Sequence, residues 1–228
     1  MNTKTYQLLE DYMLSCMEDS AHDKEHIYRV LYTAAEIAQT EKDVDYDILI
    51  TSCLLHDIGR SEQFKDPSLS HALVGGDKAH AFLIGHGFAE AFAERVRECI
   101  QAHSYRKGTP PQSVEAKILF DADKIDASGT VGIARTLIYC GQVGRPLYSL
   151  LPDGNISSGK GDEIPSFFQE YKYKLESLYS RFYTRRGTEI AKERQAAAIQ
   201  FYENIFREVC QAYTTGAELL INHIEPDL

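Results

Sequence analysis

The stretch that decides the fold runs from Ile48 to Gly59 and reads ILITSCLLHDIG. Its apolar residues fall on nearly every side of a helix, so we expect a central, buried helix over about 45–58. Gly59 is typical of a residue that ends a helix. His56 and Asp57 therefore come at the end of a buried helix, and we expect both side chains to be largely buried.

A histidine and an aspartate side by side at the end of an apolar helix allow two interpretations. Burying a carboxylate is costly unless something positive compensates for it. A divalent cation does so, and imidazole with carboxylate is an ordinary ligand set for manganese, iron, cobalt, nickel, zinc or magnesium. The alternative is a capping aspartate beside a core histidine, and the pair taken alone does not decide between the two.

Outward from this stretch, the pattern is one of helix after helix. Apolar spacing predicts further helices over about 4–18, 24–41, 70–86, 89–103, 114–127, 129–141, 166–183 and 187–213. Glycine and proline residues gather between Gly144 and Pro165, which predicts a long surface loop, and a hinge is expected near Arg186 and Gly187. Strand-like alternation is scarce, so the predicted fold class is all-α.

Two further segments carry residues that can bind a cation. His26 falls in the first turn of the second predicted helix, and the stretch from Ile118 to Asp126 reads ILFDADKID. Each also has an explanation without a metal: His26 as an ordinary residue of a first helical turn, and the acidic residues as a solvated face. Asp121 and Asp123, however, lie about 200° apart on a helix and cannot share one face. At least one of them is expected to point inward and to need a partner.

The order of these residues, His26, then His56-Asp57, then Asp123, resembles the pattern of the HD-domain metal-dependent phosphohydrolase family. Asp123 is preferred to Asp121 because the segment ADKI is similar to the family's segment around its last ligand. Residues 115–135 and the pattern between Tyr171 and Arg194 resemble a subgroup of small bacterial HD proteins that includes nucleotide pyrophosphohydrolases. The likeness extends from about residue 20 to about residue 210.

The resemblance implies a single HD-domain helical bundle over residues 1–228, with two long C-terminal helices packed on it. Its core is expected over about 20–145, followed by a surface loop over 146–164 and a C-terminal helical extension over 165–215. The implied metal ligands are His26, His56, Asp57 and Asp123. Of these, Asp57 and Asp123 are also the implied catalytic residues.

The substrate and second-metal residues are less sharply defined by the sequence. Lys124 and Arg60 lie beside the implied ligands and are candidates for binding phosphate. Lys65, Arg106 and Arg135 are weaker candidates for the same role. His71 begins a segment similar to one that some HD proteins use for a second metal, with His103 as its partner. Alternatively, His103 contacts a phosphate or a water in a site with one metal.

The resemblance implies hydrolysis of a nucleotide by a metal-activated water, with a (deoxy)nucleoside triphosphate as the expected substrate. One alternative is a phosphodiesterase or phosphomonoesterase that acts on another small phosphorylated metabolite. A second alternative is a regulatory protein that binds metal and nucleotide without turning the nucleotide over. The sequence alone specifies neither base nor sugar.

The composition argues against some classes of binding partner and indicates a cellular location. The formal net charge is −10, and no long basic run offsets it, which argues against a nucleic-acid partner. The five cysteines are scattered and never form CxxC, as expected for reduced thiols. No apolar run is long enough to span a membrane, so we expect a cytoplasmic protein that does not bind membranes. The oligomeric state is open, and an oligomer stays an alternative.

Overall fold

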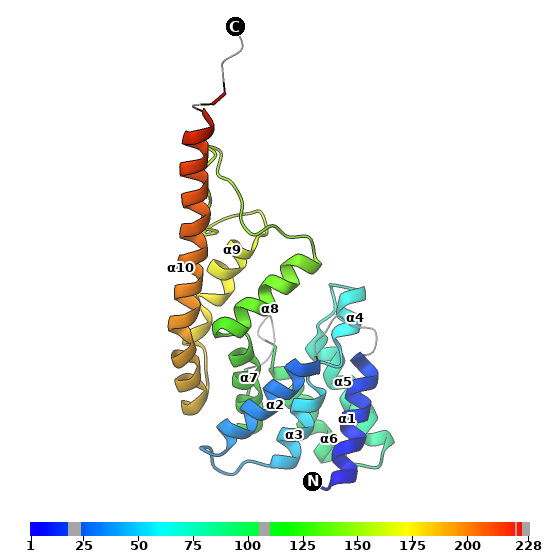
Figure 1. Ribbon diagram of the computed structural model, residues 1–228. Coiled ribbons are helices and arrows are strands. Elements are labelled where there is room, and N and C mark those ends of the chain that lie inside the picture. The colour runs from blue at the N-terminus through cyan, green and yellow to red at the C-terminus, as the bar shows by residue number, and fades with distance from the viewer. Residues whose placement is uncertain (18–23, 105–109, 222, 225–228) are drawn as a thin grey trace. The chain divides into compact units, whose positions relative to one another are not determined.

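The computed structural model describes most of the chain, namely residues 1–17, 24–104, 110–221 and 223–224. Helices dominate these residues, as Figure 1 shows. Within the described ranges no strand forms, and the nearest approach to one is an isolated antiparallel bridge between Leu150 and Ile156. The expected all-α class is confirmed.

The chain divides into two compact units. The first unit comprises Met1–Asp126 and Phe182–Glu189, and the second comprises Ala127–Arg181 and Ile190–Leu228. All the implied metal ligands, and the candidates His71 and His103, belong to the first unit. The sequence-based division into a core, a loop over 146–164 and a C-terminal extension over 165–215 stays a prediction.

The described residues of the first unit form helices α1 to α7 and the beginning of α10. The bounds are α1 Thr3–Met17, α2 Lys24–Ala38, α3 Tyr46–Leu55, α4 Arg60–Lys65, α5 His71–Gly85, α6 Glu90–Ala102 and α7 Val114–Asp126. The expected helices of this unit are therefore present, with ends that differ by a few residues. The short helix α4 was not predicted.

Helix α3 forms the centre of the first unit. Asp45 caps its N-terminus by accepting hydrogen bonds from the backbone N–H groups of Asp47 and Ile48. Leu54 and Leu55 are fully buried, and burial of such a side chain contributes about 1.5–3 kcal/mol. Helices α1, α2, α5, α6 and α7 all contact α3. The apolar helix therefore brings its C-terminal end into the middle of the unit.

Gly59 is required by a close approach between backbones. Helix α3 ends at Leu55, and Gly59 is the N-cap of α4 with φ −94°, an ordinary backbone angle. A Cβ atom at Gly59 would lie 2.3 Å from the carbonyl oxygen of His71 and 2.6 Å from the nitrogen of Gly75. The absence of a side chain thus lets α5 pack against the turn that carries His56 and Asp57.

The second unit contains α8, α9 and most of α10, and it differs from the sequence prediction in one element. The bounds are α8 Gly129–Gln142, α9 Phe167–Glu170, a π-helical turn at Tyr171–Leu175, a 3₁₀ turn at Leu178–Ser180, and α10 Arg185–Ile221. The expected single helix over 166–183 is therefore three short pieces. The wider π turn keeps Tyr171 buried, where its ring stacks on Tyr202 with centroids 4.1 Å apart.

The segment between α8 and α9 is a loop, as expected from its glycines. Asp162 organises it, accepting hydrogen bonds from the hydroxyls of Ser149 at 2.5 Å and Ser157 at 2.6 Å. Ile156 and Ser157 are buried, so part of this loop packs inward.

A buried carboxylate fixes the beginning of α10. Asp121 in α7 is fully buried and accepts hydrogen bonds from the backbone N–H groups of Tyr183 and Thr184 and from the Thr184 hydroxyl. The Thr184 hydroxyl in turn accepts a hydrogen bond from the backbone N–H of Gly187. Asp121 therefore has a structural partner of its own.

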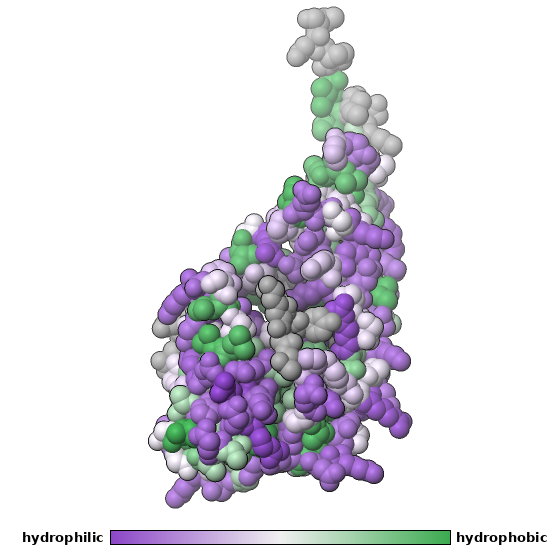
Figure 2. Space-filling view, turned by 180° about the vertical axis from the view of Figure 1, so that it is seen from behind, coloured by the Kyte–Doolittle hydropathy of each residue, from purple (hydrophilic) through white to green (hydrophobic). Residues whose placement is uncertain are grey.

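Hydrophilic residues dominate the face shown in Figure 2, with hydrophobic residues scattered in small groups. Among the described residues, no helix has the length and apolar character needed to cross a membrane.

Candidate metal centre

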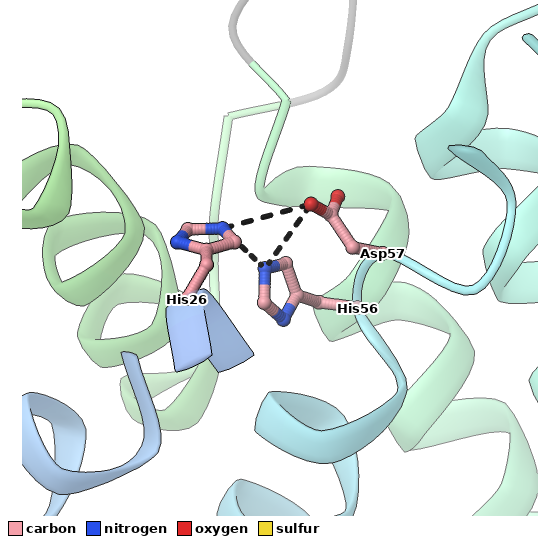
Figure 3. Close-up of side chains that lie close together, drawn as sticks. All are labelled: His26, His56 and Asp57. Carbon is pink, nitrogen blue, oxygen red and sulfur yellow. Dashed lines mark hydrogen bonds and ion pairs between the residues drawn. The ribbon is translucent and has the colours of Figure 1, made fainter. Parts of the chain in front are cut away.

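The four implied ligands come together from three helices. His26 lies in the first turn of α2, His56 and Asp57 follow the end of α3, and Asp123 lies in the last turn of α7. His26 Nε2 is 3.4 Å from His56 Nε2, 3.6 Å from Asp57 Oδ2 and 3.4 Å from Asp123 Oδ1. Figure 3 shows the two imidazoles and the Asp57 carboxylate pointing toward one another.

These separations suit one shared cation. Ligand atoms bonded to a metal at roughly 2.0–2.2 Å with tetrahedral angles lie roughly 3.3–3.6 Å from one another. His56 Nε2 and Asp57 Oδ2 are slightly farther apart, at 3.8 Å. His26, His56 and Asp57 are buried, and the Asp123 side chain is only 13% exposed. The donor set and its spacing therefore fit a divalent metal ion.

Hydrogen bonds behind the two rings define which nitrogen carries the proton. His56 Nδ1 lies 2.7 Å from the carbonyl oxygen of Cys53, which can only accept, and His26 Nδ1 lies 2.7 Å from Asp126 Oδ2. Each Nδ1 therefore donates, and in the neutral ring Nε2 carries a lone pair. The two Nε2 atoms face each other at 3.4 Å. A cation between them removes the repulsion of these lone pairs.

The charge states favour cation binding. Burial lowers the pKa of His56 to about 4, so its ring is neutral at pH 7. Burial acts to raise the pKa of Asp57, but the Arg60 guanidinium and the neighbouring histidines together outweigh it and hold that pKa well below its usual range. At Asp123 burial also acts to raise the pKa of the carboxyl, and Lys124 together with His26 and His103 outweighs it and keeps that pKa low. Both acids are therefore ionised.

A second cluster shares Asp57. His71 at the start of α5 and His103 at the end of α6 place their Nε2 atoms 3.7 Å and 3.5 Å from Asp57 Oδ1. Both Nε2 atoms are buried without a hydrogen-bond partner among the described residues. His103 Nδ1 donates to the carbonyl oxygen of Ile100 at 2.5 Å, and His71 Nδ1 lies 3.0 Å from Gln63 Oε1. These rings also direct a lone pair inward.

The two positive candidates lie beside the acids. Arg60 Nε donates to Asp57 Oδ1 at 2.9 Å, and Lys124 Nζ donates to Asp123 Oδ2 at 3.0 Å. Lys124 also lies over the ring of Phe120, 4.9 Å from its centroid. Both side chains keep some exposure, 29% for Arg60 and 17% for Lys124. They are therefore accessible to a ligand that reaches the carboxylates.

The weaker phosphate candidates were Lys65, Arg135 and Arg106. Lys65 ends α4 and is exposed, and Arg135 belongs to the second unit. Arg106 lies outside the described residues.

Sequence reasoning missed the residues that orient the rings. Asp126 accepts from His26, and Gln63 contacts His71. The role of Asp126 could have been suspected from the sequence, because a residue three positions after Asp123 lies beside it on a helix. Nothing in the sequence pointed to Gln63, because it belongs to helix α4, which was not predicted.

A separate cluster with metal-ligand side chains lies on the surface of the same unit. His80 Nε2 is 2.9 Å from Glu90 Oε1 and 3.7 Å from Glu94 Oε2. Its carboxylates are largely exposed, and Glu94 also pairs with Arg97. This surface cluster therefore differs from the buried centre in its exposure.

Comparisons with known proteins agree with this geometry. The HD domain model matches residues 24–128, which include His26, Asp57 and Asp123. The uncharacterized protein YpgQ of Bacillus subtilis (strain 168) is 32% identical over 196 residues, which cover 84% of this chain and 86% of YpgQ.

Solved structures have the same fold. The crystal structure of Bacillus subtilis YpgQ in complex with ADP gives a TM-score of 0.69 at 27% identity, covering 90% of this chain and 97% of that chain. An HD-superfamily hydrolase from Bacillus thuringiensis gives a TM-score of 0.67 at 25% identity, covering 90% and 96% of the two chains. With its helical fold and its cluster of histidines and aspartates, this chain belongs to the HD-domain family and has the fold of HD-superfamily hydrolases.

Proposed function

We propose that this protein is a metal-dependent phosphohydrolase that acts on a nucleotide, with a (deoxy)nucleoside triphosphate as its substrate class. One observation carries the proposal. Four imidazole Nε2 atoms and the carboxylates of Asp57 and Asp123 converge, and the hydrogen bonds behind the rings leave each Nε2 with a lone pair. The complex of YpgQ with ADP supports a nucleotide as the ligand.

In this proposal, His26, His56, Asp57 and Asp123 hold the catalytic cation. A divalent ion held there supplies Lewis acidity and makes a coordinated water more acidic. Asp57 or Asp123, through a carboxylate oxygen that the cation does not occupy, orients the attacking water and accepts its proton. Both carboxylates have low pKa values and therefore start the reaction ionised.

Arg60 and Lys124 bind the phosphates of the substrate. Each now pairs with a carboxylate of the centre. A phosphoryl oxygen is an equally suitable acceptor for guanidinium and ammonium groups, so these side chains can exchange partners when substrate arrives. They then neutralise the charge that develops on the phosphoryl group in the transition state.

His71 and His103, with Asp57 Oδ1, hold a second cation. A direct contact with phosphate requires a donor, and burial lowers the pKa of His71 to about 3, which leaves its ring neutral. His103 Nδ1 already donates to the backbone carbonyl of Ile100, so Nε2 is the ring nitrogen that is left with a lone pair for a cation. Lone pairs bind a cation and repel a phosphate oxygen, and this favours the metal over the phosphate contact.

The test is a hydrolysis screen on the purified protein. Nucleoside tri-, di- and monophosphates and bis-p-nitrophenyl phosphate are incubated with Mn²⁺ or Co²⁺, and phosphate and pyrophosphate are measured separately. We expect hydrolysis of triphosphates that Asp57→Ala lowers by about a thousandfold or more. His80→Ala, which alters only the surface cluster, is the matched control and retains activity.

Other outcomes of the screen contradict the proposal in distinct ways. Hydrolysis confined to the diester or to monophosphates identifies an esterase. Tight nucleotide binding without turnover under both metals identifies a regulatory protein.

A further inference from the structure

Asp126 lies directly behind a histidine of the metal centre. It is the last residue of α7, one turn after Asp123, and it is buried. Its Oδ2 atom is 2.7 Å from His26 Nδ1, and the opposite ring nitrogen, His26 Nε2, is 3.4 Å from Asp123 Oδ1. The His26 imidazole thus lies between two carboxylates of the same helix.

Among the four histidines of the two clusters, His26 alone has a carboxylate behind its ring. His56 and His103 direct Nδ1 toward backbone carbonyls, and His71 directs it toward the amide oxygen of Gln63. A hydrogen bond to an ionised acceptor is roughly twice as strong as one to a neutral acceptor. Such an acceptor also increases the electron density on the opposite ring nitrogen, which strengthens it as a metal ligand.

The carboxylate of Asp126 is itself held in place. Arg29 Nε donates to Asp126 Oδ1 at 2.7 Å, and its NH2 group lies 3.2 Å from Oδ2. Arg29 follows His26 by one turn of α2, as Asp126 follows Asp123 by one turn of α7. The guanidinium therefore fixes the orientation of the carboxylate that faces His26.

We propose that Asp126 is a positioning residue for the metal centre, fixing the His26 ring with its Nε2 lone pair toward Asp57 and Asp123 and raising its affinity for the cation. The proposal rests on the proposed function only in that the centre holds a metal. Without Asp126, the ring can rotate and exchange the proton between its two nitrogens. Loss of such an outer partner typically weakens metal binding by about 10–100-fold.

A simpler role for Asp126 is to join α7 to α2 through Arg29, with no effect on the metal. Two variants separate these roles. Asp126→Ala removes the contacts of the carboxylate with His26 and with Arg29, whereas Arg29→Met removes the ion pair and leaves the carboxylate behind His26. Asp126→Asn is a third variant, since its amide oxygen can still accept from Nδ1.

The experiment measures Co²⁺ binding to the metal-free full-length chain by calorimetry, together with ¹⁵N NMR of the histidine rings. We expect Asp126→Ala to weaken binding by about 10–100-fold and to mix the two proton positions of His26. Asp126→Asn should retain the wild-type proton position and lose less affinity. Arg29→Met should change the affinity by less than about threefold.

Two results overturn the proposal. One is unchanged Co²⁺ affinity and unchanged His26 signals in both Asp126 variants. The other is an equal loss of affinity in Arg29→Met and Asp126→Ala, which assigns the effect to the ion pair. Binding is measured without substrate. If the Co²⁺ affinity depends on Asp126 but the wild-type protein hydrolyses no nucleotide, only the proposed function is contradicted.

Discussion

His103 Nε2 lies 3.5 Å from Asp57 Oδ1, whereas His26 Nε2 lies 3.6 Å from the other oxygen of the same carboxylate. One aspartate thus faces two pairs of histidines. In the proposed function it is shared between two cations, so its removal affects both clusters, whereas removal of an outer histidine affects one.

The number of bound metals tests this sharing. We expect about two Mn²⁺ or Co²⁺ ions per wild-type chain and about one in His103→Ala, because the cluster around His26 and His56 is left intact. Asp57→Ala should retain no tightly bound ion. Elemental analysis after desalting provides the count, with His80→Ala as the control for ions at the surface cluster. A count that is the same in wild type and His103→Ala contradicts a second metal.

Lys124 is expected to act on substrate binding. Lys124→Met removes the ammonium group beside Asp123, and we expect KM for a nucleoside triphosphate to rise by about 10–100-fold. Lys117→Met, seven residues earlier on α7, is the matched control and should leave KM unchanged. Steady-state kinetics with saturating metal separates KM from kcat. An unchanged KM in Lys124→Met would mean that Lys124 does not contribute to substrate binding.

The metal-free protein should lose stability as the pH falls from 7 to 5. Burial lowers the pKa of His56 to about 4 and that of His71 to about 3, while an imidazole in the unfolded chain titrates near 6.5. Between these values the unfolded state binds protons that the folded state does not, so stability rises with pH. Each ring that stays neutral lowers the free energy of unfolding by about 2 kcal/mol at pH 5.

Urea unfolding of the chelator-treated protein at pH 7 and pH 5 measures this change. His71→Asn should show a smaller loss between the two pH values, because one of the two buried imidazoles is gone. An identical loss in wild type and His71→Asn is incompatible with a ring that stays neutral on folding.

Gly59→Ala should weaken the second cluster although Gly59 is not itself a metal ligand. The added Cβ would lie 2.3 Å from the carbonyl oxygen of His71, so α5 must shift. We expect the free energy of unfolding to fall by about 1–3 kcal/mol and the second cluster to bind metal more weakly. Gly85→Ala, at the other end of α5, meets nothing within 4 Å and serves as the control. Equal stability of the two variants in urea contradicts the close packing.

Substitution of Asp121 and of Asp123 should affect different properties, the first stability and the second metal content. Asp121→Ala leaves the buried backbone N–H of Thr184 and the partly buried N–H of Tyr183 without their acceptor, which we expect to lower the free energy of unfolding by about 2–4 kcal/mol. Its metal content should be unchanged. Asp123→Ala should lose metal with little effect on the stability of the metal-free protein. The reverse pattern would exchange the roles of the two residues.

Much of the fold was readable from the sequence because helices depend on local periodicity. The apolar stretch from Ile48 predicted a buried central helix, and burial of His56 and Asp57 at its end is confirmed. The choice between Asp121 and Asp123 was different. Helix α7 is apolar on nearly every side, so its periodicity did not predict which of the two carboxylates faces the metal ligands. In the structure, Asp121 is fully buried and Asp123 nearly so, and each contacts a different partner.

The remaining features depend on contacts between distant segments. The break in the expected helix over 166–183 follows from packing of Tyr171 against Tyr202, and the requirement for Gly59 follows from the approach of α5. Neither leaves a local signature. Asp126 showed only its spacing from Asp123, and its partner His26 lies 100 residues away.

The oxygens behind the imidazoles have one more consequence. The carbonyls of Cys53 and Ile100 belong to helices α3 and α6, which are held by their buried apolar side chains and not by the proposed ion. An arriving cation therefore meets ligands that are already ordered and loses little free energy to rearrangement. We expect chelators to strip the ion without unfolding the chain. Different divalent metals should then exchange readily, so the supply of metal in the cell selects the ion that the protein carries.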